Sequence, residues 1–204
     1  MQQNLPLADR ILDTALAIAE NGSWEDLQLH AVAANLDIPL ERIREYYAQK
    51  DDLAEAWFDR ADRRLLSWQP EAEFYEQPEY TRLRQVIMHW LEALEPHHRI
   101  TREMLYYKLE PGHIHLQALG VMRISRTVQW FREMARLQAS SLKRIVEETV
   151  VTGIYLASFG RWLLDDSPHR SDNTESFMAR ALGCLQRRDS ARNNGPERKP
   201  DPPA

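Results

Sequence analysis

The residues with the clearest chemistry lie in the segment "IPLERIREYYAQKDDL", residues 38–53. Its pattern predicts a short helix over about 39–47 that turns Arg42, Arg44 and Tyr46 outward. An arginine can donate two hydrogen bonds to one guanine in the major groove of DNA, and a tyrosine hydroxyl can bond to a phosphate. These side chains therefore indicate contact with DNA. The alternative is a solvated helix face, on which the two glutamates of the same helix balance the arginines.

Three neighbouring side chains extend this candidate DNA site. Gln28 and His30 stand at the start of another predicted helix, over about 27–35, where they could meet the DNA backbone. Leu40, from the apolar row of the short helix, is also included in the site. Two short helices joined by a tight turn are typical of proteins that enter the major groove. We therefore expect double-stranded DNA as a partner.

The sequence does not indicate an enzyme. It has no Ser-His-Asp order, glycine-rich phosphate loop or separated pair of carboxylates, so we expect no catalytic residue and no cofactor. Two histidine pairs, His97 with His98 and His113 with His115, raise the question of a metal. They lack the i,i+4 spacing of helical ligand pairs, and no cysteine supports them. We therefore interpret them as surface histidines and expect no metal site.

Large aromatic side chains gather in the second half of the chain. An apolar pocket with a few polar groups would suit a small amphipathic or lipid-like molecule, and these rings could line one. Ordinary packing in a hydrophobic core is the alternative. The candidate pocket residues are Trp90, Tyr106, Tyr107, Trp130 and Trp162.

The segment "RISRTVQWFREMAR", residues 123–136, sets several arginines against a single glutamate, Glu133. Such a segment could attract an anionic ligand, an acidic partner or a membrane surface. A solvated helix face is the alternative.

Composition and charge limit the class of protein. The chain has 204 residues and a formal net charge of −5, and residues 1–60 hold five basic and twelve acidic residues, a balance of −7. Because phosphate repels an acidic surface, any DNA binding should be weak and strongly salt-dependent. The single cysteine, Cys184, cannot form an internal disulfide and fits a reducing compartment. The N-terminus lacks a signal-peptide pattern and Val150–Leu164 is too short to span a membrane, so we expect a soluble cytoplasmic protein.

Helical periodicity runs through most of the chain, and no alternating run of β-branched residues suggests a strand. We therefore expect an all-α protein of about nine helices. A loop with two prolines at 69–78 should separate the first four helices from the rest. The predicted helices span 7–20, 27–35, 39–47, 50–68, 79–95, 98–109, 115–137, 141–165 and 173–186.

The segment 10–57, "RILDTALAIAENGSWEDLQLHAVAANLDIPLERIREYYAQKDDLAEAW", resembles the head of the TetR family of bacterial regulators. "HAVAANLDI" stands where that family has an alanine-rich second helix and turn, and "RIREYYAQKDDL" stands where it has its short third helix. In this frame Lys50 matches a basic residue at the start of the fourth helix, which adds it to the expected DNA contacts. The resemblance implies a helix-turn-helix head of three helices, a larger helical ligand-binding body, and a homodimer.

Small residues near the end of the chain agree with such a dimer. Gly153 and Ala157 lie four residues apart on one predicted helix, with Gly160 close by, so a helix of a second chain could approach closely. With Phe177 on the next helix, they form the dimer interface that the resemblance implies. Two chains would supply two reading heads for a two-fold DNA site.

A second resemblance leaves an alternative function. The stretch 154–183, "IYLASFGRWLLDDSPHRSDNTESFMARALG", resembles the accessory family of coenzyme Q biosynthesis, which shares the TetR-like fold and serves as a lipid-binding partner of a hydroxylase. Members of that family usually add an amphipathic membrane-binding helix, whereas the tail here is polar. The alternative is thus an accessory protein that binds a lipid or quinone intermediate and not DNA.

Three parts of the chain are expected from these patterns. Residues 1–60 should form the DNA-binding-like head, and residues 61–186 should form the ligand-binding and dimerisation body. Residues 187–204 are polar and proline-rich and should be a disordered tail. The favoured function is a ligand-responsive transcriptional repressor that acts as a homodimer.

Overall fold

The computed structural model describes residues 5–109, 114–138 and 141–193. All regular structure in these ranges is helical, which confirms the predicted all-α class. The elements are α1 (Leu7–Glu20), α2 (Leu29–Leu36), α3 (Leu40–Arg44), α4 (Lys50–Ser67), α5 (Ala72–Glu76), α6 (Glu79–Leu94), the 3-10 helix η2 (Glu95–His97), α7 (His98–Leu109), α8 (Ile114–Ala135), α9 (Ser141–Leu164) and α10 (Arg170–Asn193). In the part of the chain that these ranges cover, no helix is long and apolar enough to cross a membrane.

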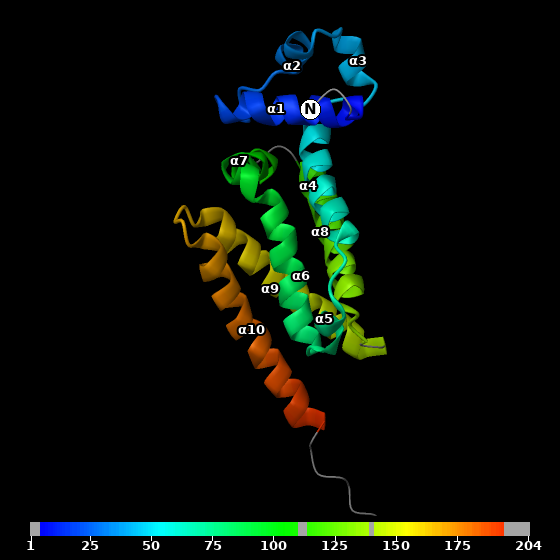
Figure 1. The fold of residues 1–204 in the computed structure, drawn as a ribbon, viewed down its shortest axis with the longest axis vertical. Coiled ribbons are helices and arrows are strands. Elements are labelled where there is room, and N and C mark those ends of the chain that lie inside the picture. The colour runs from blue at the N-terminus through cyan, green and yellow to red at the C-terminus, as the bar shows by residue number, and fades with distance from the viewer. Residues whose placement is uncertain (1–4, 110–113, 139–140, 194–204) are drawn as a thin grey trace, which may run out of the picture.

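The first three helices form a head at one end of the molecule (Figure 1). The amphipathic pattern of α1 places Ile11, Leu12 and Ala15 in the core, and Trp24 after it is fully buried. Asp37 ends α2 in the left-handed region, with φ of 53°, which aspartate tolerates better than most residues. The chain can therefore turn sharply into α3, where Ile43 is fully buried.

The helix α4 connects the head to the body. Figure 1 shows it running from beneath α1 down along α6 and α8. It crosses residue 60, where the sequence predicts the boundary between head and body. The same helix therefore belongs to the packing of both parts.

Aromatic rings fill the middle of the body. The ring of Trp90 on α6 lies 5.8 Å from that of Phe131 on α8, and 5.7 Å and 5.4 Å from those of Tyr155 and Phe159 on α9. Edge-to-face ring pairs at such distances stabilise the fold beyond the contribution of the buried apolar area. The indole nitrogen of Trp90 donates to Asp62 Oδ1 on α4 at 2.7 Å, so the buried ring also has its polar group satisfied.

Three sequence-based expectations need correction. The predicted loop at 69–78 contains α5, whose Phe74 is buried with its ring 5.2 Å from that of Trp68. The predicted tail is helical as far as Asn193, because α10 continues beyond residue 187, and residues 194–204 lie outside the described ranges. His98 is buried instead of exposed, and its Nε2 lies 2.9 Å from the carbonyl oxygen of Trp162.

His97 is half-buried, and its Nδ1 lies 3.0 Å from Glu20 Oε1. The backbone of His113 and the side chain of His115 are outside the part of the chain that the structure describes.

The head is fastened to α7 by a guanidinium group. Arg99 donates hydrogen bonds to the carbonyl oxygens of Ala19 at 3.1 Å, Glu20 at 2.8 Å and Gly22 at 3.1 Å. The carbonyls of Ala19 and Glu20 lie at the C-terminal end of α1 and that of Gly22 lies just beyond it. The last carbonyls of a helix lack partners within the helix, and its dipole favours a cation there. Arg99 therefore supplies from the body what α1 lacks at its own end.

A carboxylate completes this joint. Arg99 pairs with Glu103 at 2.6 Å, and Glu103 Oε2 accepts a hydrogen bond from the backbone N–H of Trp24 at 2.7 Å. The buried indole of Trp57 on α4 donates to Thr101 Oγ1 at 2.9 Å, which ties α4 to α7 as well. The head, α4 and α7 thus meet in one connected hydrogen-bond network.

The turn between α9 and α10 depends on Asp165. Its Oδ1 accepts the backbone N–H of Ser167 at 2.9 Å, and its Oδ2 accepts the side-chain amide of Asn173 at 2.8 Å. The side-chain hydrogen bonds from Ser167 and Asn173 hold the pKa of Asp165 at about 2, below its ordinary value. This turn sets the direction in which α10 returns along α9.

We predict that Arg99→Ala lowers the free energy of unfolding by about 1–2 kcal/mol, because three carbonyl oxygens and Glu103 lose a charged donor at a partly exposed site. Urea denaturation followed by circular dichroism measures this. The matched control is Arg63→Ala, whose guanidinium is mostly exposed and lies 3.8 Å from Asp9 Oδ1. Equal losses in the two variants would contradict the role given to Arg99.

We predict that Asp165→Asn lowers the thermal midpoint at pH 7 and that the difference from the wild type disappears as the pH falls. The folded pKa of about 2 lies below the unfolded value of 3.8, so the carboxylate stabilises the fold above about pH 4 and loses this effect between pH 4 and pH 2. Melting curves over this pH range, with the exposed Asp172→Asn as control, test the sign. A difference that stays constant down to pH 2 would exclude the carboxylate as its cause.

Candidate nucleic-acid interface

The predicted DNA-contacting side chains of α3 lie on the outer surface of the head. Ile43 points into the core, while Leu40 and Tyr46 are 51% and 45% exposed, and Arg42 and Arg44 are exposed as well. Figure 1 shows α2 and α3 on the side of α1 that faces away from the body. A DNA duplex could therefore approach this face without meeting the body.

The helix α3 is shorter than predicted, since it ends at Arg44 and the chain then turns towards α4. Tyr47 is buried, and its hydroxyl donates to the carbonyl oxygen of Ala8 at 3.1 Å. This bond pins the end of the turn to α1. Tyr46, next to it, is left on the surface.

The two arginines of α3 differ in their partners. Arg42 donates a hydrogen bond to Glu45 one turn later, and this bond raises the pKa of Arg42 above its ordinary value. Arg44 forms no ion pair with any residue that the structure describes. The guanidinium of Arg44, with its five N–H donors, is therefore more available to a ligand than that of Arg42.

Gln28 and His30 at the start of α2 are also exposed. Gln28 is the N-cap residue of α2 and His30 lies in its first turn, on the helix that leads into the turn before α3. Both side chains are open to solvent, and their contact with the DNA backbone stays a prediction.

Lys50 is half-buried and binds groups of the protein itself. Its Nζ donates to the carbonyl oxygens of Trp24 at 3.2 Å and Glu25 at 3.0 Å, and it lies 4.6 Å from the centre of the Tyr107 ring. Burial lowers the pKa of this ammonium below its ordinary value. Lys50 therefore anchors the loop before α2 to the start of α4, which sequence spacing alone does not reveal.

Much of the acidity of the head is directed away from α3. Asp9 and Asp13 on α1 pair with Arg60 on α4, and Glu20 pairs with Arg99 on α7. Glu55 and Asp59 on α4 pair with Arg123 on α8, at 3.0 Å and 2.7 Å. Arg60 is already counted in the balance of −7 in residues 1–60, whereas Arg99 and Arg123 belong to the body and are not. The balance therefore overstates the negative charge of the head, because these two arginines pair with Glu20, Glu55 and Asp59.

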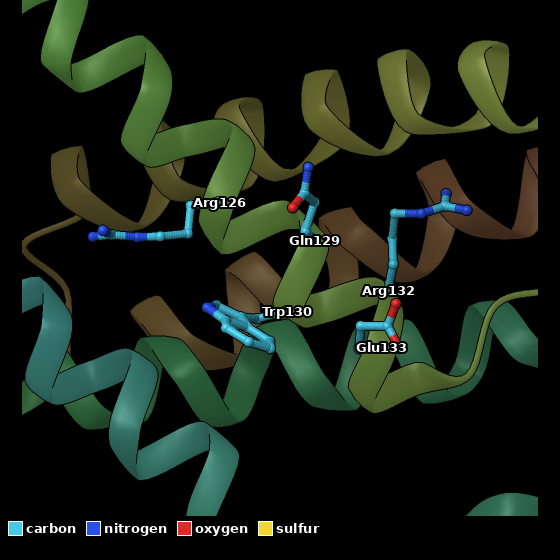
Figure 2. Close-up of a pocket in the computed structure, with 5 residues that line it drawn as sticks. All are labelled: Arg126, Gln129, Trp130, Arg132 and Glu133. Carbon is cyan, nitrogen blue, oxygen red and sulfur yellow. The ribbon is translucent and has the colours of Figure 1, made fainter.

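The structure does not bring the five candidate pocket residues together. Trp90 and Trp162 are buried, and Phe159 connects them, with its ring 5.4 Å from that of Trp90 and 6.1 Å from that of Trp162. Tyr107 lies beside Lys50, while Tyr106 and Trp130 are exposed. Ordinary core packing, the alternative in the sequence analysis, describes the two buried tryptophans. The outer side of α8 carries a pocket that includes Trp130 (Figure 2).

The small residues of α9 face outward. Gly153 and Ala157 are exposed, and an added methyl group at Gly153 or Gly160 would meet no atom of the chain within 4 Å. Phe177 on α10 is half-buried, with the guanidinium of Arg161 6.0 Å from its ring centre. The two helices thus present a face with room for another helix.

Neither family models nor curated proteins give a match. Among solved structures, a TetR transcriptional regulator from Nitrosomonas europaea is 42% identical with a TM-score of 0.78, covering 89% of this chain and 99% of that one. A TetR regulator from Rhodococcus sp. RHA1 is 17% identical with a TM-score of 0.63, covering 91% and 97% of the two chains.

A third structure, a TetR-family regulator from Streptomyces coelicolor, is 15% identical with a TM-score of 0.60 and covers 95% of this chain and 91% of its own. The two lower identities show a shared fold, while the first likeness extends to the sequence over nearly the whole length. These relatives are transcriptional regulators, in agreement with the expectation that the chain is not an enzyme. Because its 42% identity to one such regulator spans 89% of its length, the chain belongs to the TetR family of transcriptional regulators.

Proposed function

We propose that this protein is a ligand-responsive repressor of the cytoplasm that binds double-stranded operator DNA as a homodimer. The observation that carries the proposal is the outward face of α3 and the residues just after it, where Leu40, Arg44 and Tyr46 are exposed while Ile43 is buried in the core. Residues 1–60 would serve as the DNA-binding domain and residues 61–186 as the ligand-binding and dimerisation domain. The helix α4 passes from one to the other.

Each exposed side chain of α3 has a fitting partner on DNA. The guanidinium of Arg44 matches the two acceptors of a guanine in the major groove, and the side chain of Leu40 suits the methyl group of a thymine. Tyr46 lies just after the helix, where its hydroxyl could reach a phosphate. Arg42 is held by Glu45 in an exposed pair, and such pairs are weak enough for a phosphate to displace the glutamate.

A homodimer would place two copies of the α3 face on one two-fold DNA site. Helices α9 and α10 pack on each other and leave Gly153 and Ala157 exposed, which suits a four-helix interface between two copies. The spacing of the two heads would then depend on the orientation of α4 in each copy. A ligand that moves α4 would change that spacing and release the operator.

We predict that the wild-type protein retards DNA from the region upstream of its own gene at low salt, and that Arg44→Ala weakens this binding by about tenfold to a hundredfold, as expected for loss of a bidentate arginine contact. Electrophoretic mobility shift at increasing salt measures both effects. Arg64→Ala is the control, because it removes an exposed arginine of α4 outside the head. A folded wild-type protein that shifts no DNA at micromolar concentration would favour the accessory lipid-binding alternative.

We predict that Gly153→Arg converts a dimer into a monomer without unfolding the chain. The new side chain meets no atom of its own chain within 4 Å at the Cβ position, and arginine favours a helix more than glycine does. Sedimentation velocity gives the mass, and circular dichroism gives the helix content. Ala17→Arg on the exposed side of α1 is the control and should remain a dimer. A monomeric wild type would contradict the proposed assembly.

A further inference from the structure

A pocket of about 400 Å³ lies on the outer side of α8, and its size suits a small organic molecule. Only one of its residues, Trp130, belongs to the pocket that the sequence predicts. Figure 2 shows the side chains around it. The described residues that line it are Arg126, Gln129, Trp130, Arg132 and Glu133.

The pocket offers an aromatic surface and a guanidinium close together. Trp130 is 38% exposed, so a large apolar ring remains open to solvent there. Arg126 lies one helical turn before it, and in Figure 2 both side chains extend to the same side of α8. Gln129 adds an amide that can donate a hydrogen bond.

The charges around the pocket differ in availability. Arg132 is buried and paired with the buried Glu147 at 3.1 Å, so this pair is fixed and neutral. Arg126 is 51% exposed and pairs with Asp59 on α4 at 2.7 Å. Such a surface pair contributes little to stability, so the guanidinium can exchange partners at small cost. Glu133, also at the pocket, and Asp59 are the carboxylates that oppose an anion here.

We propose that this pocket binds a small organic anion with an aromatic body. The carboxylate of the ligand pairs with Arg126, and its ring lies against Trp130. An arginine and a carboxylate can form two parallel hydrogen bonds. The indole ring beside the arginine gives the ligand an apolar contact as well.

The position of Arg126 gives such a ligand a route to the head. Asp59 accepts hydrogen bonds from both Arg123 and Arg126, so α4 is held to α8 by two guanidinium groups. A ligand that takes Arg126 leaves Arg123 as the remaining contact of Asp59. This consequence rests on the proposed function, whereas the binding itself can be measured without DNA.

Isothermal titration of the full chain with 2-naphthoate tests the binding. Arg126→Gln should weaken it by about tenfold to a hundredfold, because a charged hydrogen-bond partner is lost. Trp130→Ala should also weaken it, and Asp59→Asn should strengthen it, because this variant removes the carboxylate that competes for Arg126. Arg64→Gln, which changes an exposed arginine that is not among the described lining residues, should bind as the wild type does.

Two analogues test the charge. Neutral 2-naphthylmethanol and cationic 2-naphthylmethylammonium should both bind more weakly than 2-naphthoate. The proposal is overturned if either analogue binds as tightly, if Arg126→Gln binds like the wild type, or if 2-naphthoate does not bind at millimolar concentration. Failure here leaves DNA binding by α3 untouched, and a protein that binds 2-naphthoate but no DNA would overturn only the proposed repressor function.

Discussion

The carboxylate of Asp62 on α4 is buried against α6 and α8, and its contacts restrict the orientation of α4. Burial raises the pKa of this group, and the guanidinium of Arg123 and the hydrogen bond from Trp90 oppose that rise. Arg123 approaches Asp62 Oδ2 at 3.2 Å, and Thr127 approaches both carboxylate oxygens at 3.3 Å and 3.4 Å. A buried acid that loses its partners costs several kcal/mol, on the order of 3–5. Rotation of α4 about its own axis would separate these groups, so the contacts of Asp62 oppose such a rotation against α6 and α8.

The same arginine explains why the acidic composition of the head is compatible with its fold. Arg123 contacts Glu55, Asp59 and Asp62, which lie along one side of α4, and its guanidinium lies 5.3 Å from the ring centre of Phe58. These acids serve the contact between α4 and α8. A sum of charges over residues 1–60 assigns Glu55 and Asp59 to the head, while in three dimensions they pair with the body. Net charge alone is therefore a poor guide to the surface that α3 presents.

The sequence predicts the helices well and the side-chain partners poorly, for physical reasons. Apolar periodicity determines α1 and α6 almost to the residue, because burial of one face is a local property of the pattern. The short α5 escapes prediction because prolines flank it and a single buried ring, Phe74, holds it to the body.

The candidate site shows the same division. The exposure of Arg44 follows from the burial of Ile43 next to it on the same short helix, so the pattern predicts it. Tyr46 is exposed because α3 ends at Arg44 and the chain leaves the helical path before it. The use of Lys50 to hold the carbonyls of Trp24 and Glu25 depends on residues about 25 positions away, and Arg99 is further still from the end of α1. No local spacing reports contacts of that range, and the burial of Trp90 and Trp162 was ambiguous for the same reason.

The head is held to the body at two separate places along α1. Near its start, Asp9 and Asp13 pair with Arg60 of α4, and at its end the carbonyls of Ala19 and Glu20 bind Arg99 of α7. The orientation of α1 is thus set by α4 and α7. These two helices are themselves joined by the hydrogen bond from Trp57 to Thr101. A shift of α4 relative to α7 would move one end of α1 more than the other. Because Tyr47 donates to the carbonyl of Ala8 and Ile43 is buried, α3 would turn with α1, so a small displacement in the body would rotate the exposed face of the head.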